Sequence, residues 1–251
     1  MNAALYRKIF FYGFLLTLWH GLYQAKIWPE YLFPSPADVG ANLWQGLREQ
    51  SYIFAILASF RRLLIGYGLS VVLGLPLGIL LARYRWLEQT LGSLVLGLQT
   101  LPSICWLPLA ILWFGLSDSA IIFVVVIGSL LSVTIATKSG IQQVAPLLLK
   151  AARTMGAEGV RLYRYVILPA ALPTVMSGLK QGWSFAWRSL MAGELLFVNV
   201  GLGHLLDAGR ELNDMSQVIA VIAIIVVLGW LTDRFVFASL ERKIAERWGF
   251  H

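Results

Sequence analysis

Charged residues are scarce in this sequence. They make up 13% of its 251 residues, against 58% hydrophobic ones, and the mean hydropathy is +0.73. Soluble domains average about 25% charged residues. A chain with so few charges cannot cover a water-exposed globule with polar surface, so we predict an integral membrane protein.

Cysteine and histidine are too few for covalent or metal chemistry. The single cysteine, Cys105, cannot form an internal disulfide, and His20, His204 and His251 lie far apart. Neither residue type shows the spacing of a metal site. The apolar runs contain no paired carboxylates, and the sequence contains no Gly-x4-Gly-Lys-Ser/Thr phosphate loop. We therefore predict no catalytic residue, no metal and no bound cofactor, which disfavours a membrane-embedded enzyme and excludes an ATPase.

Acidic residues are fewer than basic ones, 13 against 20, and the formal net charge is +7. A basic balance can indicate nucleic-acid binding. Here the cations form no dense patch and lie at the ends of apolar runs. This distribution favours a membrane protein that holds its cations on the cytoplasmic side, and no nucleic-acid partner.

Apolar runs long enough to cross a bilayer as helices occur at six places, since a span needs about 20 residues. We predict an all-α polytopic membrane protein with no separate soluble domain, whose spans are 9–23, 52–82, 87–114, 119–137, 172–197 and 217–236. Pro102 and Pro108 break the third run. Residues 24–50 are predicted as an outer loop, and a short polar stretch precedes the last span.

The cations fix the orientation of these spans. With the N-terminus inside, few cations lie in outer loops (Lys26, Arg48 and Arg210), and far more are cytoplasmic. The cytoplasmic ones are Arg7, Lys8, Arg83, Arg85, Lys138, Lys150, Arg153, Arg161, Arg164, Arg234, Arg242, Lys243 and Arg247. The positive-inside rule then places both termini in the cytoplasm.

Two pairs of glycines have small-xxx-small spacing, Gly74 with Gly78 and Gly178 with Gly182. This spacing allows helices to approach closely.

The long polar loop between the fourth and fifth spans carries the most information. Two short helical stretches are predicted there, separated near Gly156. From Ala151-Ala152 through Gly156 to Val166-Ile167-Leu168-Pro169, the loop resembles the Glu-Ala-Ala ("EAA") loop of ATP-binding-cassette importer permeases. Lys150 stands where that family usually has Glu. Further segments resemble the nitrate/sulfonate/taurine branch, and sulfonate permeases most: 33–36, 59–62, 107–115 and 201–203.

The resemblance implies a type I importer permease in a bacterial inner membrane. The whole chain, 1–251, is then one transmembrane domain with a cytoplasmic coupling loop at 138–170. The implied partners are ATPase subunits that bind ATP and Mg, an extracytoplasmic substrate-binding protein and a second permease copy, in a homodimer. The implied substrate is a small anion such as a sulfonate, taurine or nitrate. The residues expected to contact the ATPase are Ala151, Ala152, Arg153, Met155, Gly156, Leu168 and Pro169.

Charged residues inside the spans are candidates for the substrate pathway. Arg61 and Arg62 lie near the outer headgroups, and we interpret them as snorkelling anchors, with a substrate role for Arg61 as the alternative. Arg188 lies deeper, where a lipid-facing charge costs at least about 2.5 kcal/mol. It either contacts the passing anion, which would be a functional use, or pairs with Glu194 or with the neighbours of Arg61, which would be a structural use. Glu194, six residues on, points to another face of an ideal helix, which disfavours a direct bond to Arg188 and leaves open a pairing of Glu194 with another helix.

A rival interpretation is a stand-alone ion-coupled secondary transporter. Such a protein needs ionisable groups near the bilayer centre and internal repeats. Arg188 and Lys180 are the only candidates for such groups, and no repeat is evident.

Overall fold

The computed structural model describes residues 3–196 and 200–248. Every regular element in these ranges is helical, which confirms the predicted class. The elements are α1 (Ala3–Gln24), α2 (Pro36–Arg48), α3 (Ser51–Arg83), α4 (Arg85–Leu87), η1 (Glu88–Gly92), α5 (Ser93–Gln99), η2 (Ser103–Trp106), α6 (Leu107–Phe114), α7 (Asp118–Gln142), α8 (Pro146–Thr154), α9 (Gly159–Leu162), η3 (Tyr163–Ile167), α10 (Leu168–Glu194), α11 (Leu202–Glu211), α12 (Met215–Thr232), η4 (Asp233–Phe237) and α13 (Ala238–Trp248).

The chain divides into two compact units. One comprises Met1–Ser59 and Val198–Leu228, and the other comprises Phe60–Phe197 and Gly229–His251. Helices α3 and α12 each contribute residues to both. All candidate coupling and pathway residues named from the sequence fall in the second unit.

In the first unit, a helix occupies part of a predicted loop. The Ser35 Oγ accepts a hydrogen bond from the Asp38 N–H at 3.1 Å, and the Asp38 carboxylate accepts one from the Ser35 N–H at 3.1 Å. This capping box, with Pro36 in the first turn, begins α2. The prediction of a loop over residues 24–50 is wrong for Pro36–Arg48, because the prolines mark a helix start as well as irregular chain.

The polar stretch before the last span is also helical. Here α11 begins at Leu202, whose N–H donates to the Ser59 Oγ at 2.9 Å. Asp207 and Arg210 pair along the same helix at 2.6 Å. The hydrogen bond thus ties the start of α11 to the α3 residue Ser59.

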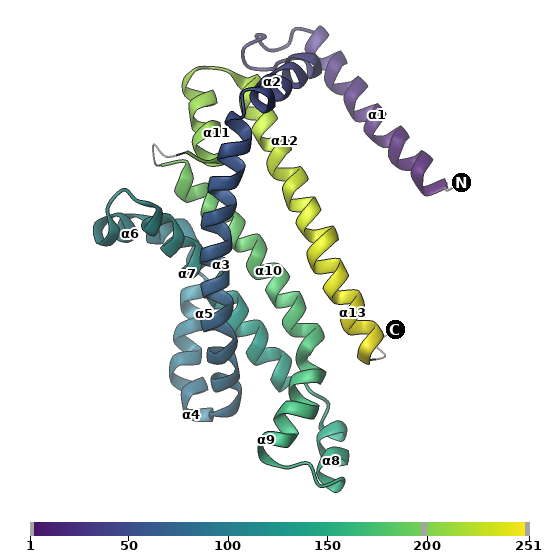
Figure 1. Ribbon diagram of the computed structural model, residues 1–251, viewed down its shortest axis with the longest axis vertical. Coiled ribbons are helices and arrows are strands. Elements are labelled where there is room, and N and C mark those ends of the chain that lie inside the picture. The colour runs from purple at the N-terminus through teal and green to yellow at the C-terminus, as the bar shows by residue number, and fades with distance from the viewer. Residues whose placement is uncertain (1–2, 197–199, 249–251) are drawn as a thin grey trace. The chain divides into compact units, whose positions relative to one another are not determined.

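In the second unit, α3 and α10 pack against α7, and the predicted glycine pairs lie at these helix contacts. A methyl group on Gly178 would lie 1.9 Å from the Ala136 Cβ, and one on Gly78 would lie 2.6 Å from the Thr134 carbonyl oxygen. A methyl group on Gly74 or Gly182 would lie 3.0 or 2.9 Å from the Val133 side chain of α7. Figure 1 shows α7 and α10 running alongside each other. The small-xxx-small spacing therefore predicted real helix contacts.

The third predicted span is sharply broken. The helical segments 85–99 and 103–114 meet at a bend of 102°. Pro102 lies at this break, whereas Pro108 lies in the first turn of α6. Backbone N–H groups in the first turn make no hydrogen bond within the helix, so the missing N–H of a proline there does not disturb it. Only one of the two prolines therefore interrupts the span.

Helices lie at all six predicted span positions, but they differ in apolar character. Three are long and apolar enough to cross a membrane: Ser51–Arg83, Asp118–Gln142 and Met215–Glu246. The bent pair provides a fourth if it is one span. The helices at the other two positions, α1 and α10, have 22 and 27 residues. The predicted end of the fifth span, Phe197, lies outside the described residues.

Candidate functional site

The loop between α7 and α10 folds as two short helices around Gly156, as predicted. The Gly156 N–H donates to the Arg153 carbonyl at 2.9 Å, and the Ala157 N–H donates to the Ala152 carbonyl at 2.9 Å. This is a Schellman motif, which requires a left-handed residue just past the helix end. Gly156 has φ +82°, a conformation that glycine adopts without a Cβ penalty. The sharp end of α8 is thus encoded by a single glycine.

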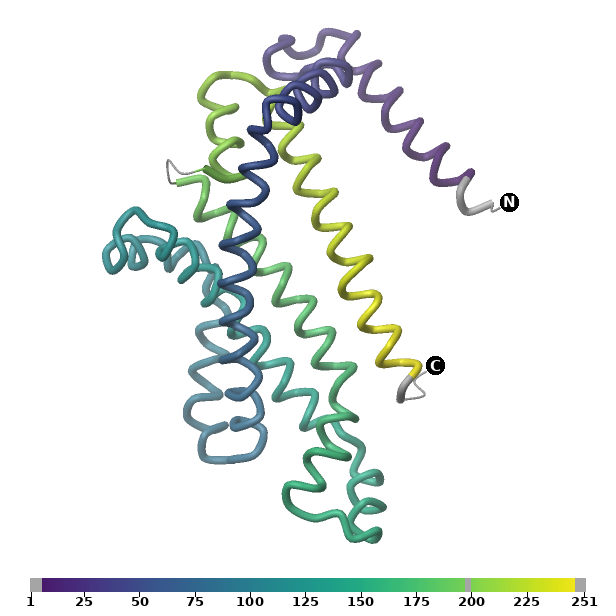
Figure 2. Tube along the Cα trace, viewed as in Figure 1, coloured from purple at the N-terminus to yellow at the C-terminus, as the bar shows by residue number. Residues whose placement is uncertain are grey.

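The small residue Ala152 holds α8 against the rest of the unit. It is buried in an apolar cluster with Ile141 and Val144 from the end of α7, and with Leu162 and Ala171 beyond the turn. Ile79 and Ala82 of α3 pack on the same cluster. The loop is therefore a fixed projection, seated on the ends of three long helices. Figure 2 shows its two short helices beyond the start of α10.

The predicted coupling residues divide between the seat and the surface. Ala152 is buried, and Pro169 is half-buried where α10 begins. Met155 is 87% exposed and Leu168 36% exposed. The remaining members of the set are exposed: Ala151, Arg153 and Gly156. One part of the motif thus anchors the loop, and the other part is available to a partner.

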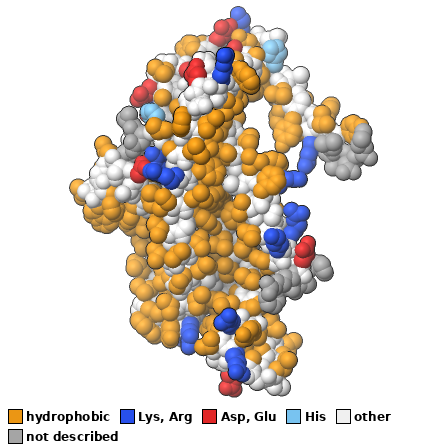
Figure 3. Space-filling model, viewed as in Figure 1, with side chains coloured by type: hydrophobic (Ala, Val, Ile, Leu, Met, Phe, Trp, Pro, Cys, Tyr) orange, Lys and Arg blue, Asp and Glu red, His pale blue; other side chains and the backbone are white. Residues whose placement is uncertain are grey.

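Two further exposed apolar residues lie on the short helices that flank Met155 in the sequence. Leu147 on α8 is 78% exposed and Val160 on α9 is 75% exposed. Figure 3 shows this end of the molecule, where blue basic side chains lie among orange apolar ones. We call Leu147, Met155 and Val160 the apolar face of the loop. Sequence reasoning did not assign Leu147 or Val160 to the contact with the ATPase, although Leu147 lies on the same nine-residue helix as the buried Ala152 and far round from it.

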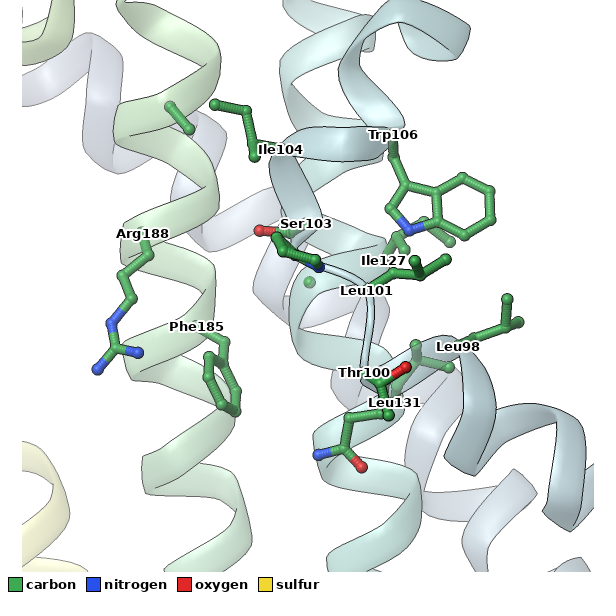
Figure 4. A pocket seen from close by; sticks show the side chains of 14 residues that line it. Leu98, Thr100, Leu101, Ser103, Ile104, Trp106, Ile127, Leu131, Phe185 and Arg188 are labelled. Atoms are coloured by element: carbon green, nitrogen blue, oxygen red, sulfur yellow. The ribbon is translucent and has the colours of Figure 1, made fainter.

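Arg188 lines a cavity of about 410 Å³ beside the break in the third span. Across the cavity lie Thr100, Leu101 and Ser103, and Ile127 of α7 contributes to the wall (Figure 4). We call this space the Arg188 cavity. Non-helical backbone at membrane depth is tolerated where it is buried in protein or lines a water-filled cavity. The volume falls in the range of about 300–1,000 Å³ typical of small-molecule sites.

The Arg188 side chain is exposed. Its guanidinium carbon lies 5.4 Å from the centre of the Phe185 ring, and no carboxylate among the described residues pairs with it. In Figure 4 the guanidinium points along α10, away from Ser103. The next residue, Ser189, donates to the Ser103 Oγ at 2.8 Å and so ties α10 to the break. Of the two uses predicted for Arg188, the structural ion pair with Glu194 is absent from the described chain.

Glu194 and Arg61 lie in a separate cluster around Arg62. The Arg62 side chain is only 5% exposed and bonds to the Asp118 Oδ1 and the Glu194 Oε1, both at 2.8 Å. Arg61, which is 66% exposed, contacts the other Asp118 oxygen at 2.5 Å. We call these four residues the Arg62 cluster. Glu194 thus pairs with another helix, which the sequence left open.

The interpretation of Arg62 as a snorkelling anchor is wrong. A snorkelling side chain keeps its charged head in water, whereas this guanidinium is buried between α3, α7 and α10. Its partners are 56 and 132 residues away in the sequence, so no local pattern announced the pairing. Asp118 also suits its place in the first turn of α7, because a helix N-terminus favours negative charge.

Lys180, the other cation considered within a span, also has a carboxylate partner. Its Nζ lies 2.5 Å from the Asp233 Oδ1 in η4. Within residues 3–196 and 200–248 there is no grouping of His, Cys, Asp and Glu that could hold a metal ion. Arg188 is therefore the span cation that combines a cavity with the absence of an ion-pair partner in the described chain.

Residues 74–245 match the model of a protein family described as the inner membrane component of binding-protein-dependent transport systems. A putative ABC transporter permease protein of Methanocaldococcus jannaschii is 36% identical over 185 residues, which are 73% of this chain and 69% of that protein. The putative aliphatic sulfonates transport permease protein SsuC of Escherichia coli (strain K12) is 35% identical over 218 residues, 86% of this chain and 82% of its own.

A solved structure shares the fold. The similar chain belongs to the MetNI methionine ABC transporter in an inward-facing conformation, with a TM-score of 0.68. The match covers 77% of this chain and 96% of the other, at 20% sequence identity.

Proposed function

The chain belongs to the family of inner-membrane components of binding-protein-dependent transport systems, and on that basis we propose how its residues perform transport. As an ABC importer permease subunit it is a transport protein and not itself an enzyme. Its proposed task is to form the pathway for a small anion and to transmit the work of a separate ATPase through the loop between α7 and α10. The observation that carries the proposal is the shape of this loop: a buried alanine seat, an abrupt glycine turn and an exposed apolar face.

A loop with this construction suits mechanical coupling. The apolar cluster that contains Ala152 also contains residues of α7 and α10, and α3 residues pack against it, so a displacement of α8 is passed through the cluster to the ends of all three helices. The apolar face supplies contact area to the ATPase, which binds ATP and Mg. The segment 138–170 is thus the proposed coupling loop, with Ala151, Arg153, Met155 and Gly156 at the contact and Leu168 and Pro169 passing the movement to α10.

The coupling role is tested by Gly156→Val with Gly115→Val as a matched control. Both glycines have positive φ, +82° and +67°, and a Cβ at either meets nothing within 4 Å. Each substitution should therefore cost backbone strain of about 1–3 kcal/mol, and Gly115, with ψ −169°, is the more strained of the two sites, so the control is not the milder change. We expect the ATPase subunit to co-purify with the Gly115 variant and to be largely lost from the Gly156 variant, with both variants present in the membrane. Equal recovery of the ATPase would contradict the coupling role.

The proposed topology has six spans with both termini in the cytoplasm. It rests on helices at all six positions and on the excess of cations in the segments assigned to the inside. Exposed positions for cysteine labelling in a Cys105→Ala background are Gln45, Asn213 and Glu158. In intact cells, an impermeant thiol reagent should label cysteines at Gln45 and Asn213 and leave one at Glu158 unlabelled. Labelling at Glu158 alone would reverse the orientation.

The proposed substrate is a small anion of the sulfonate, taurine or nitrate kind. The Arg188 guanidinium, which has no ion-pair partner in the described chain, lines a cavity of about 410 Å³ and supports this proposal, because a fixed cation lowers the barrier to an anion's passage. One cation suffices, whereas several would hold the anion too tightly to release it. The similar SsuC is named as an aliphatic sulfonates permease. We keep Arg61 and Glu194 as secondary candidates that influence the pathway through the Arg62 cluster.

The proposed assembly contains two copies of this chain, two ATPase subunits and an extracytoplasmic substrate-binding protein. The family description itself names binding-protein dependence. Cross-linking in membranes through single cysteines is the direct check on the homodimer, and a species containing a different permease would contradict it. The alternative of a stand-alone ion-coupled transporter finds no support among the relatives.

A further inference from the structure

The outward surface of the coupling loop is strongly basic. Four cations, Lys150, Arg153, Arg161 and Arg164, lie between residues 146 and 165, where Glu158 is the single acid. All five side chains are exposed. None of the four cations has an ion pair within the described chain. The described fold therefore uses none of these charges in an ion pair, although the Arg164 guanidinium carbon lies 5.9 Å from the centre of the Tyr165 ring.

Helix geometry directs Lys150 away from the permease. Ala152 marks the seated side of α8, and each helical residue turns by about 100°. Lys150, two positions earlier, therefore projects about 200° from the buried side. Leu147 and Thr154, its neighbours three and four residues away, share this outward side. Lys150 thus stands in the middle of the surface that a docked protein meets.

A simple excess of cytoplasmic cations does not account for this surface. The positive-inside rule explains their sign, but it does not explain why Leu147, Met155 and Val160 are 78%, 87% and 75% exposed among them. Apolar residues rimmed by charge mark protein interaction sites. Lipid headgroups match the charge but offer no apolar cleft to a projection beyond the span ends.

We propose that the ATPase subunit receives this loop in a cleft with an apolar floor and an acidic rim, in which Asp or Glu side chains face Lys150, Arg153 and Arg161. The inference rests on the proposed coupling role and adds the sign of the charge on each side of the contact between the loop and the ATPase. Complementary charge across an interface steers association and rejects partners of the wrong sign. The acidic rim thereby selects this permease over chains that present an acidic loop.

The test measures the Kd of the purified cognate ATPase subunit for the permease in detergent and asks whether Lys150→Glu raises or lowers it. We expect the Kd to rise about tenfold, equivalent to about 1.4 kcal/mol, with Lys150→Gln intermediate and Arg161→Glu similar to Lys150→Glu. Lys243→Glu is the matched control, since Lys243 is an exposed lysine on α13, outside the loop. Raising salt from about 0.1 M to about 1 M shortens the Debye length from about 10 Å to about 3 Å, and should weaken the wild type more than Lys150→Glu.

Unchanged or tighter binding by Lys150→Glu contradicts the inference, because an acidic rim cannot prefer a glutamate. A second outcome also overturns the inference. If the charge variants bind the ATPase in detergent as tightly as the wild type does, while only the wild type binds to vesicles of anionic lipid, the cations serve lipid headgroups. A wild-type chain that does not bind the ATPase contradicts the proposed function as well. Tight binding indifferent to Lys150 contradicts the inference alone.

Discussion

Two groups of cations in the second unit differ in their burial and in their ion pairs. In the Arg62 cluster, a guanidinium 5% exposed is held by two carboxylates at 2.8 Å, from helices α7 and α10. In the coupling loop, Lys150 and its basic neighbours are exposed and have no ion pair in the described chain. In the first group, the cations are paired with carboxylates of the same chain. In the second group, the cations remain free to pair with carboxylates of another protein.

The difference separates charge that holds the fold together from charge that is exposed and available to a partner. A buried arginine is stable only when its hydrogen-bonding partners are in place, so Arg62 fixes where α3, α7 and α10 meet. An exposed cation contributes little to stability, so the loop cations can serve a partner without weakening the fold. Arg188 stands between the two groups, because it is exposed and has no ion pair within residues 3–196 and 200–248, yet it lines a cavity inside the proposed spans.

The comparison predicts its largest effect at Arg62. Arg62→Ala leaves Glu194, which is 2% exposed, buried without its guanidinium. Breaking a buried pair in this way costs about 3–5 kcal/mol. We expect much less protein in the membrane and a lower Tm in detergent, measured by fluorescence-detected size exclusion after heating.

The neighbouring arginine provides the control. Arg61→Ala removes a guanidinium that is 66% exposed, and an exposed pair contributes about 0–1 kcal/mol. Adding Glu194→Gln to Arg62→Ala should recover part of the lost stability, because the orphaned charge is removed. If Arg62→Ala is tolerated as well as Arg61→Ala, the cluster is not structural and the comparison fails.

A smaller loss of stability is expected where α10 closes on α7. Gly178→Ala places a methyl group 1.9 Å from the Ala136 Cβ, and such overpacking costs about 1–3 kcal/mol. Gly68→Ala makes the same change in α3, where a Cβ meets nothing within 4 Å. There the higher helix propensity of alanine should stabilise by up to about 1 kcal/mol.

The order of the two Tm values checks this prediction. Gly178→Ala should fall below the wild type and Gly68→Ala should equal or exceed it. Ala136→Gly in the Gly178→Ala background should restore the space and much of the Tm. Equal Tm values for the two single variants would mean that α7 and α10 do not approach as closely as the structure shows.

Sequence reasoning succeeded where the signal is local. The turn at Gly156 and the helix contacts at Gly178 follow from spacings of a few residues, and both are confirmed. It failed at Arg62, because the charge environment depends on residues 56 and 132 positions away. The α2 helix was missed for a different reason: prolines were interpreted as loop signals, although Pro36 follows a capping serine and begins a helix.

ATP-driven uptake is the most direct test of the proposal that this chain carries a small anion past Arg188, which has no ion-pair partner among the described residues. Proteoliposomes containing the permease, its ATPase and a sulfonate-loaded binding protein should take up labelled sulfonate only when ATP is supplied on the ATPase side. Arg188→Gln should reduce the rate by about tenfold, a barrier increase of about 1.4 kcal/mol, at normal protein level and ATPase binding. Arg234→Gln should leave the rate unchanged, because Arg234 is also exposed beside an aromatic ring, 5.6 Å from the Trp230 centre, but lies outside the Arg188 cavity. Equal rates for the two variants, or no ATP-driven uptake by the wild type, would contradict the claim.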